Sequence, residues 1–174
     1  HEFRRFKRYF RPLTLAVADV DFFKKINDTY GHQAGDKALM LLGKVISTKL
    51  RKVDFVARLG GEEFVILLPE TAGDKALTVL EKVREGVSRI PFKVQGKQFQ
   101  VTISFGLTEF NAEDSMDSAF ERADKALYSA KTQGRNRSIL YRKKSPVDAA
   151  TKPSRGGRAR TQSASMADIP RMRI

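Results

Sequence analysis

The chain has 174 residues, a length typical of one domain with extensions. It contains no cysteine, which excludes a disulfide framework and cysteine metal sites. No apolar run reaches the roughly 18 residues that a membrane span needs, and no signal peptide is evident. We therefore expect a cytoplasmic protein. Because the first residue is His1 rather than Met, we expect a piece of something longer, even of a membrane-bound protein, or a processed chain.

The formal net charge of +13 lies mostly in the two ends of the chain. Residues 142–174 hold nine Lys and Arg against two Asp and Glu, and residues 1–12 hold five against one. Residues 13–141 are nearly balanced, with 19 against 17. Basic ends of this kind are usually solvated tails, and the other basic ends bind nucleic acid or an acidic membrane surface. We expect a helical linker remnant or domain start over 1–12, a folded domain over 13–141 and a basic, disordered tail over 142–174.

The first twelve residues mix aromatic and basic side chains. Phe3, Phe6 and Phe10 recur at helical spacing, and Pro12 should end that helix. Such a helix could bind nucleic acid. The simpler interpretation is an amphipathic helix that packs its aromatic side chains on the domain or on an upstream linker.

Residues 13–20 (LTLAVADV) predict a buried first strand with carboxylates at its end. Asp19 and Asp21 are costly there unless something pairs with them, and this is where an open α/β-type sheet usually places ligands. The alternative is that one or both cap the next turn. Residues 22–26 predict a short turn or helical piece, and residues 27–36, rich in turn formers, predict a loop.

The segment RLGGEEFVILL, residues 58–68, predicts a tight β-hairpin. Two apolar runs, residues 55–59 and 65–68, flank Gly60 and Gly61, and glycine takes the positive φ that such turns need. The two carboxylates that follow, Glu62 and Glu63, should lie beside a rigid tip. Such a tip is a sensible place for a divalent metal, although an acidic hairpin tip is more often a solvated turn.

Apolar side chains at helical spacing predict three longer helices, over residues 36–50, 74–89 and 115–132. Residues 92–94 and 99–107 predict a second hairpin-like pair with one face buried, and residues 138–141 predict a last short strand. The order resembles a ferredoxin-like or palm βαββαβ core with an added β-hairpin. We expect an α+β fold, in which a mixed, mostly antiparallel sheet is flanked by helices on one face. Polymerising palms and RNA-recognition modules share related cores, so the fold alone does not choose the function.

Three segments together resemble the GGDEF family of diguanylate cyclases: DVDFFKKINDTYGHQAGD, RKVDFVARLGGEEF and ADKALYSAKTQGRNR. The resemblance covers residues 13–141. It implies an enzyme that condenses two GTP into cyclic di-GMP and two pyrophosphates, with each 3′-hydroxyl attacking the α-phosphate of the other GTP. It further implies a homodimer and an upstream sensory or receiver domain outside this chain. No nucleic-acid partner is expected.

The resemblance also implies roles for single residues. Two Mg²⁺ (or Mn²⁺) ions per active site are implied, with Asp19, Glu62 and the main-chain carbonyl of Val20 as ligands. Glu63 is a further candidate ligand, and Glu62 and Glu63 are the catalytic candidates. The implied GTP-binding residues are Phe22, Phe23, Lys24, Asn27, Asp36, Gly60, Gly61, Lys131 and Arg135. Among them Asn27 and Asp36 resemble the guanine readers, and Lys131 and Arg135 the contacts to the β- and γ-phosphates. The role of Asp21 is left open.

Arg51 and Asp54 form the pattern RxxD, which at this distance from Gly60 resembles the family's inhibitory product site. Arginine can grip a phosphate and stack on guanine, and Lys82 could lend a charge from the next helix.

Two other classes of function compete with the cyclase. A catalytically silent receptor for cyclic di-GMP would carry a damaged GGEEF motif, which is not seen. A nucleic-acid-binding module would place basic and aromatic residues across the sheet face, whereas here the basic excess lies in the ends.

Overall fold

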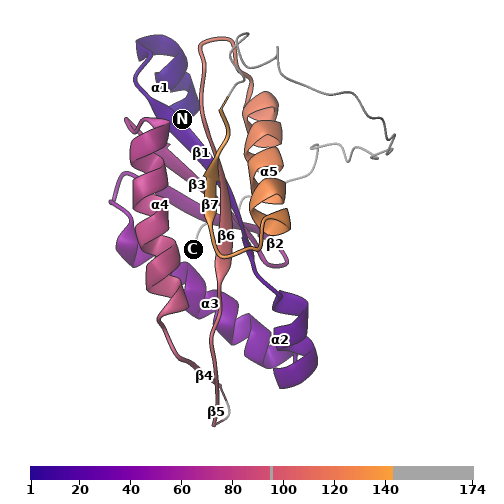
Figure 1. Ribbon diagram of the computed structural model, residues 1–174. Coiled ribbons are helices and arrows are strands. Elements are labelled where there is room, and N and C mark those ends of the chain that lie inside the picture. Colours follow the sequence, from indigo (N-terminus) through magenta and orange to yellow (C-terminus); the bar gives the residue numbers. More distant parts are fainter. Residues whose placement is uncertain (95, 143–174) are drawn as a thin grey trace, which may run out of the picture. The chain divides into compact units, whose positions relative to one another are not determined.

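A five-stranded sheet in the order β2-β3-β1-β6-β7 organises the unit His1–Tyr141 (Figure 1). The computed structural model describes residues 1–94 and 96–142. The strands are β1 (Leu13–Val20), β2 (Phe55–Gly60), β3 (Glu63–Pro69), β4 (Phe92–Val94), β5 (Lys97–Phe99), β6 (Ile103–Glu109) and β7 (Ser138–Leu140). The helices are α1 (Glu2–Tyr9), α2 (Phe23–Tyr30), α3 (His32–Lys49), α4 (Gly73–Ser88) and α5 (Met116–Thr132). None of the described helices is long and apolar enough to cross a membrane. The predicted tail over 142–174 lies, apart from Arg142, outside the described residues.

The sheet is mixed and mostly antiparallel, which confirms the predicted α+β class. Strand β1 runs antiparallel to both of its neighbours, β3 and β6, and β2 runs antiparallel to β3. Only the β6–β7 pair is parallel among the described strands. The first four strands of the order, β2-β3-β1-β6, have the predicted βαββαβ arrangement. The predicted hairpin at Gly60–Gly61 is the β2–β3 connection.

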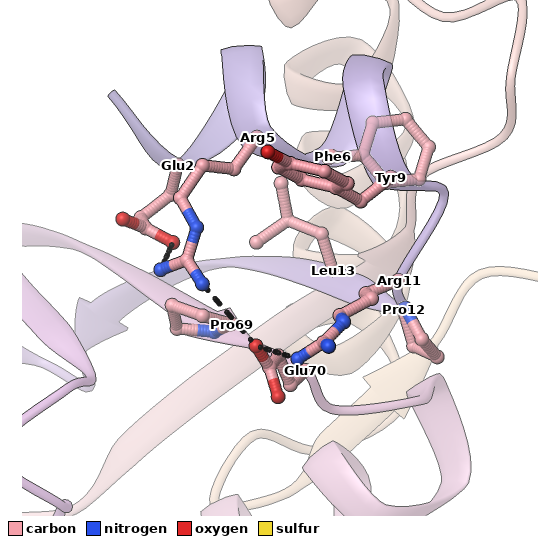
Figure 2. A pocket seen from close by; sticks show the side chains of 9 residues that line it. All are labelled: Glu2, Arg5, Phe6, Tyr9, Arg11, Pro12, Leu13, Pro69 and Glu70. Atoms are coloured by element: carbon pink, nitrogen blue, oxygen red, sulfur yellow. Dashed lines mark hydrogen bonds and ion pairs between the residues drawn. The ribbon is translucent and has the colours of Figure 1, made fainter.

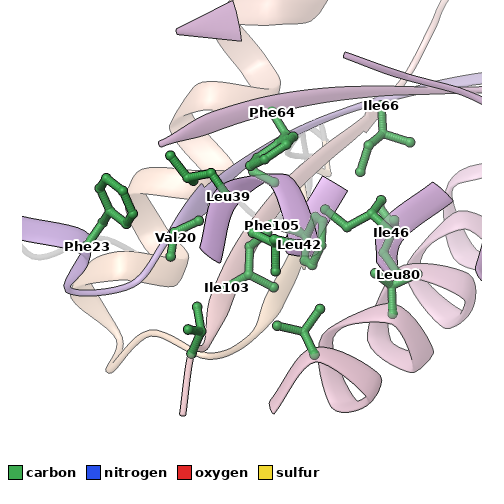
Figure 3. Packing of buried hydrophobic residues seen from close by; sticks show 14 of the residues in the cluster. Val20, Phe23, Leu39, Leu42, Ile46, Phe64, Ile66, Leu80, Ile103 and Phe105 are labelled. Carbon is green, nitrogen blue, oxygen red and sulfur yellow. The ribbon is translucent and has the colours of Figure 1, made fainter. Parts of the chain in front are cut away.

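Helices cover both faces of the sheet, so the prediction of helices on one face was wrong. Alternate side chains of β1 enter two separate cores, because neighbouring residues of a strand point to opposite faces. Ala16, Ala18 and Val20 pack with α3 and α4, a core shown in Figure 3. Leu13, Leu15 and Val17 pack with α5 and with Phe6 of α1. In Figure 1, α4 and α5 lie on opposite sides of the sheet.

Helix α1 packs its aromatic side chains on the domain, in line with the simpler of the two interpretations. Phe6 is buried, and the rings of Phe3 and Phe6 lie 5.3 and 5.6 Å from the ring of Phe110. Phe10 stays 65% exposed and takes a left-handed conformation where the helix ends. Burying one such side chain contributes roughly 1.5–3 kcal/mol.

The predicted loop over residues 27–36 was wrong, since these residues belong to α2 and α3 with a break only at Gly31. Phe23 and Ile26 give α2 a buried face, which outweighs the local preference for turns. The two helices touch closely at Gly35. A Cβ atom at Gly35 would come 1.9 Å from Oδ1 of Asn27. The turn-like glycine therefore serves helix packing and not a loop.

The predicted hairpin-like pair is confirmed at Phe92–Val94 and Lys97–Phe99, but its long second strand over residues 99–107 was wrong, because the chain there is divided between β5 and β6. Strand β5 pairs with β4 in a separate two-stranded sheet, where Phe92 lies opposite Phe99. Strand β6 begins at Ile103, which pairs with Val20, the last residue of β1. It is buried on both faces over residues 103–108, because α5 covers the face that the sequence pattern suggested was less buried.

Helix α5 lies so close to β6 that one position tolerates no side chain. A Cβ atom at Gly106 would meet the carbonyl oxygen of Ala123 and the nitrogen of Leu127, each at 2.1 Å. We predict that Gly106→Ala lowers the free energy of unfolding by about 3 kcal/mol or more, since backbone atoms cannot yield cheaply. Urea unfolding measures the loss.

Gly43→Ala is the matched control for Gly106→Ala. Gly43 lies inside α3, where an added Cβ would contact, among the described residues outside its own helix, only the Phe64 ring at 3.7 Å. This change should raise stability by about 0.5–1 kcal/mol, because alanine loses less backbone entropy in a helix. Equal effects of the two changes would contradict the packing argument.

Candidate active site

The acidic hairpin tip and the acidic end of β1 meet at one edge of the sheet. In the β1–β3 register Asp19 lies opposite Glu63. The backbone N–H of Val20 donates to the carbonyl of Glu62 at 3.3 Å. Gly61 makes the turn with φ +49°, and a Cβ atom at Gly60 or Gly61 would meet nothing within 4 Å. The predicted pairing of the two strands is thus confirmed, and the approach to the tip is open.

The carboxylates at this edge repel one another. Burial raises the pKa of Glu62 above its ordinary value of 4.5, and the negative charge of Asp19 raises it further, against the opposing charge of Lys131. Burial raises the pKa of Glu63 as well, followed by the charges of Asp19 and Asp124. A group of acids whose charged forms are disfavoured favours an added cation.

Lys131, from the last turn of α5, reaches into this edge. Its ammonium group contacts the Asp19 carboxylate and donates to Oδ1 of Asp21 at 2.9 Å and to the Asp19 carbonyl at 3.2 Å. Lys131, a predicted phosphate contact, therefore lies beside Asp19, a predicted metal ligand. The close approach of α5 at Gly106 makes this reach possible.

Asp21 is the residue whose role the sequence left open, and it is the best-connected carboxylate of the site. Its side chain is fully buried. Besides Lys131, it accepts hydrogen bonds from the hydroxyls of Thr102 and Ser104, both at 2.8 Å, and from the backbone N–H of Asn136 at 2.9 Å. In the sequence Asp21 follows a strand end and lies within the first segment that carries the family resemblance, and Asn136 lies within the third. Thr102 and Ser104 lie in none of the three segments.

Phe22 and Arg135 face each other beside this network. Both take left-handed backbone conformations, with φ 56° and 62°. The Arg135 guanidinium lies 4.6 Å from the centre of the exposed Phe22 ring, a cation–π contact. Phe22 also precedes α2, whose first N–H groups have no partner within the helix and suit an anion. Phe23 differs, since its side chain lies in the core, and Lys24 is exposed.

The two predicted guanine readers lie on the facing helices α2 and α3. Oδ1 of Asn27 is buried and has no hydrogen-bond partner in the described part of the chain. Gly35, which contacts it closely, directly precedes Asp36. Asp36 is exposed and does not cap α3, because the helix begins four residues earlier. A buried acceptor without a partner is costly, so a ligand donor at Asn27 would be favourable.

The predicted inhibitory site forms a turn. The backbone N–H of Arg51 donates to Oδ2 of Asp54 at 2.9 Å, and the Arg51 guanidinium donates to the hydroxyl of Thr71 at 3.1 Å. The Asp54 side chain is 1% exposed, and its Oδ1 has no partner among residues 1–94 and 96–142. Within those residues no hydrogen bond or ion pair joins Lys82 to this turn.

A cavity of about 300 Å³ lies at the opposite end of β1, under α1 (Figure 2). Arg5 and Arg11 both bind Glu70 there, at 3.4 and 2.8 Å. None of the predicted GTP-binding residues lines this cavity.

The donor set at the acidic edge fits a hard divalent cation. It consists of carboxylate oxygens and a main-chain carbonyl, the ligands that Mg²⁺ prefers, and burial together with the charge of Asp19 raises the pKa of Glu62 and of Glu63. Among the described residues, no three His, Cys, Asp or Glu side chains already converge as a metal site. Any cation would therefore need further ligands, such as phosphate oxygens.

Comparison with known proteins decides the family. The family model described as "Diguanylate cyclase, GGDEF domain" matches residues 1–137. The chain belongs to the GGDEF family. This confirms the resemblance that the three sequence segments carried.

Relatives of this GGDEF domain agree in sequence and in structure. The chain is 46% identical to the diguanylate cyclase DgcP of Pseudomonas aeruginosa over 125 residues, which is 72% of this chain and 19% of that relative. The active GGEEF domain of a diguanylate cyclase from Vibrio cholerae has a TM-score of 0.76 at 35% identity, covering 82% of this chain and 91% of the other. The GGDEF domain of DgcB from Caulobacter crescentus, solved in complex with c-di-GMP, has a TM-score of 0.77 at 36% identity, covering 80% and 84%.

The raised pKa of Glu62 predicts a gain in stability when its charge is removed. The folded chain holds this proton to higher pH than the unfolded chain, so the free energy of unfolding falls as pH rises through the folded pKa. Without divalent cations at pH 7, Glu62→Gln should therefore raise the melting temperature by about 1–3 °C. The gain should vanish below about pH 4, where the wild-type Glu62 side chain is mostly protonated and therefore as neutral as the glutamine that replaces it. A lower melting temperature of Glu62→Gln at pH 7 would contradict the raised pKa of Glu62, which burial and the charge of Asp19 cause.

Proposed function

We propose that this GGDEF domain is a diguanylate cyclase, which condenses two GTP molecules into cyclic di-GMP and two pyrophosphates. The observation that carries the proposal is the meeting of Asp19 and the Glu62–Glu63 tip with Lys131 and Arg135 at one sheet edge. A nucleoside triphosphate and its metal need this combination of carboxylates for the cations and cationic groups for the phosphates. The wide match to cyclase relatives supports it.

In each half of the reaction, the 3′-hydroxyl oxygen of one GTP bonds to the α-phosphorus of the other. The bond between that α-phosphorus and the oxygen that bridges it to the β-phosphorus breaks, and pyrophosphate leaves with that oxygen. Glu62 and Glu63 are the candidate acceptors for the hydroxyl proton, because they lie at the tip beside the strand end that carries Asp19. Because the product is a ring built from two GTP, two domains must face each other, and we propose a homodimer.

The remaining groups bind and orient GTP. Lys131, Arg135 and the first N–H groups of α2 would hold the β- and γ-phosphates. The unpartnered amide oxygen of Asn27, with Asp36, would accept the donors of guanine that adenine lacks. Two Mg²⁺ or Mn²⁺ ions held by Asp19, Val20 carbonyl, Glu62 and Glu63 would neutralise charge on the triphosphate and on the attacking oxygen. We place the domain in the cytoplasm, behind an upstream sensory or receiver domain that controls pairing.

The competing nucleic-acid class loses support from the fold. RNA-recognition modules stack bases on an open sheet face. Here the central strands β1 and β6 are almost entirely buried on both faces. A catalytically silent receptor would be recognised by binding of cyclic di-GMP without turnover of GTP.

The cyclase proposal predicts turnover of GTP with Mg²⁺ when two chains are paired. Fusion to a dimerising partner should give cyclic di-GMP and pyrophosphate in a 1:2 ratio, while the rate per unfused chain should rise with protein concentration. Glu62→Ala should abolish turnover and keep the fold, as circular dichroism would show. Glu121→Ala, an exposed acid that pairs with Lys125 on α5, is the matched control with normal turnover. Absence of product from the paired wild type would refute the cyclase.

We also propose product inhibition through Arg51, Asp54 and Lys82. The buried, unpartnered Oδ1 of Asp54 suits guanine N–H donors, and the Arg51 guanidinium suits phosphate or the guanine ring.

Arg51→Ala should weaken cyclic di-GMP binding about tenfold or more, measured by calorimetry, because it removes a charge-assisted contact. Lys82→Ala should cost less, since an ammonium group binds phosphate at a single point. Arg89→Ala, an exposed arginine at the end of α4, should leave affinity unchanged. Unchanged product affinity in Arg51→Ala would refute this site.

A further inference from the structure

The turn that carries Arg135 has an unusual backbone. Gly134, Arg135 and Asn136 all have positive φ, at 114°, 62° and 45°. This region costs a residue such as arginine roughly 1–3 kcal/mol, although asparagine tolerates it better, so Arg135 keeps it only where its surroundings hold it. Something must therefore fix the turn that follows α5.

Asn136 is held from two sides. Its backbone N–H donates to Oδ2 of Asp21 at 2.9 Å, at the centre of the candidate active site. Its side-chain Oδ1 accepts from Nη1 of Arg84 at 2.8 Å, on α4. Asp21 binds Lys131 through its other carboxylate oxygen. One residue thus connects the site carboxylate to a helix on the other face of the sheet.

Arg84 is a prepared anchor for Asn136. Its guanidinium is held by three hydrogen bonds to the Glu81 carboxylate, between 2.9 and 3.1 Å. Glu81 also accepts from the backbone N–H of Ser138 at 2.9 Å, so α4 is joined to the chain on both sides of Arg137. Burial raises the pKa of Glu81, but the hydrogen bonds from Arg84 and Ser138 outweigh burial and lower it.

We propose that Asn136 is a positioning residue of the GTP site, which joins Asp21 to Arg84 and so fixes Lys131 and Arg135 where the triphosphate binds. This inference rests on the proposed function. Asn136 itself touches no substrate in this scheme. Its contribution comes through the turn: Arg135 precedes it directly, and Lys131 shares the Asp21 carboxylate with it.

The test is binding of 3′-deoxy-GTP, which lacks the attacking hydroxyl and cannot react, to the full chain in Mg²⁺ buffer. Asn136→Gly keeps the positive φ and the N–H to Asp21 and removes only the acceptor for Arg84. Arg84→Met removes the donor. Each change should weaken binding about tenfold, the value of one charge-assisted hydrogen bond. The double variant should lose less than the sum of the two single losses, because each change removes the Asn136–Arg84 contact, while Arg84→Met also removes the bonds to Glu81.

Two further variants separate positioning from a merely structural role. Asn136→Asp keeps an acceptor for Arg84 but adds a negative charge, so it should bind 3′-deoxy-GTP more tightly than Asn136→Gly and more weakly than the wild type. Asp114→Asn weakens another arginine contact of the fold, the ion pair of Asp114, just before α5, with Arg122. It should lower the melting temperature and leave the affinity for 3′-deoxy-GTP unchanged.

Wild-type affinity in both single variants, or additive losses in the double variant, would overturn the role of Asn136 while the wild type still binds. A wild-type chain that binds no 3′-deoxy-GTP would overturn the proposed function and this inference together.

Discussion

The burial of Asp21 constrains the whole active edge. A buried carboxylate is tolerable only when donors surround it, and here the donors come from separate segments of the chain. Ser104 connects Asp21 to β6, and Thr102 connects it to the segment just before that strand. Lys131 connects Asp21 to α5, and Asn136 connects it to the turn that follows α5. The hydrogen bonds that satisfy the charge of Asp21 therefore fix the positions of β1, β6 and α5 relative to one another. The residues proposed to bind phosphate are placed as a consequence.

That constraint depends on close packing between α5 and β6. The face of β6 toward α5 carries Ser104, Gly106 and Thr108, which bind Asp21, leave room for the helix backbone and bind Arg122, respectively. With a larger residue at Gly106 the helix would stand further from the sheet. Lys131 would then no longer reach the end of β1. Fold stability and the geometry of the site thus share one packing contact.

The site itself is costly to the fold. Burial and the neighbouring charge of Asp19 disfavour the ionised forms of Glu62 and Glu63, and Asn27 buries an oxygen without a partner among the described residues, as does Asp54 of the proposed inhibitory site. Such unsatisfied groups are common where a ligand completes the set. The cavity under α1 shows no such unsatisfied group and lies at the other end of β1.

The sequence by itself determined the local chemistry. Apolar runs and turn-forming residues were enough to predict β1, the β2–β3 hairpin and α5, since their patterns are strong over short distances. The motif order predicted the GGDEF family and the meeting of Asp19 with the acidic tip. The tertiary structure decided what depends on packing between distant segments. Helix α2 formed where turn formers predicted a loop, because Phe23 and Ile26 are buried against other elements. The partners of Asp21 and the connection from Asn136 to Arg84 join residues 52 to 115 positions apart. No local pattern encodes contacts of that separation, because their strength comes from burial and geometry that only the folded chain provides.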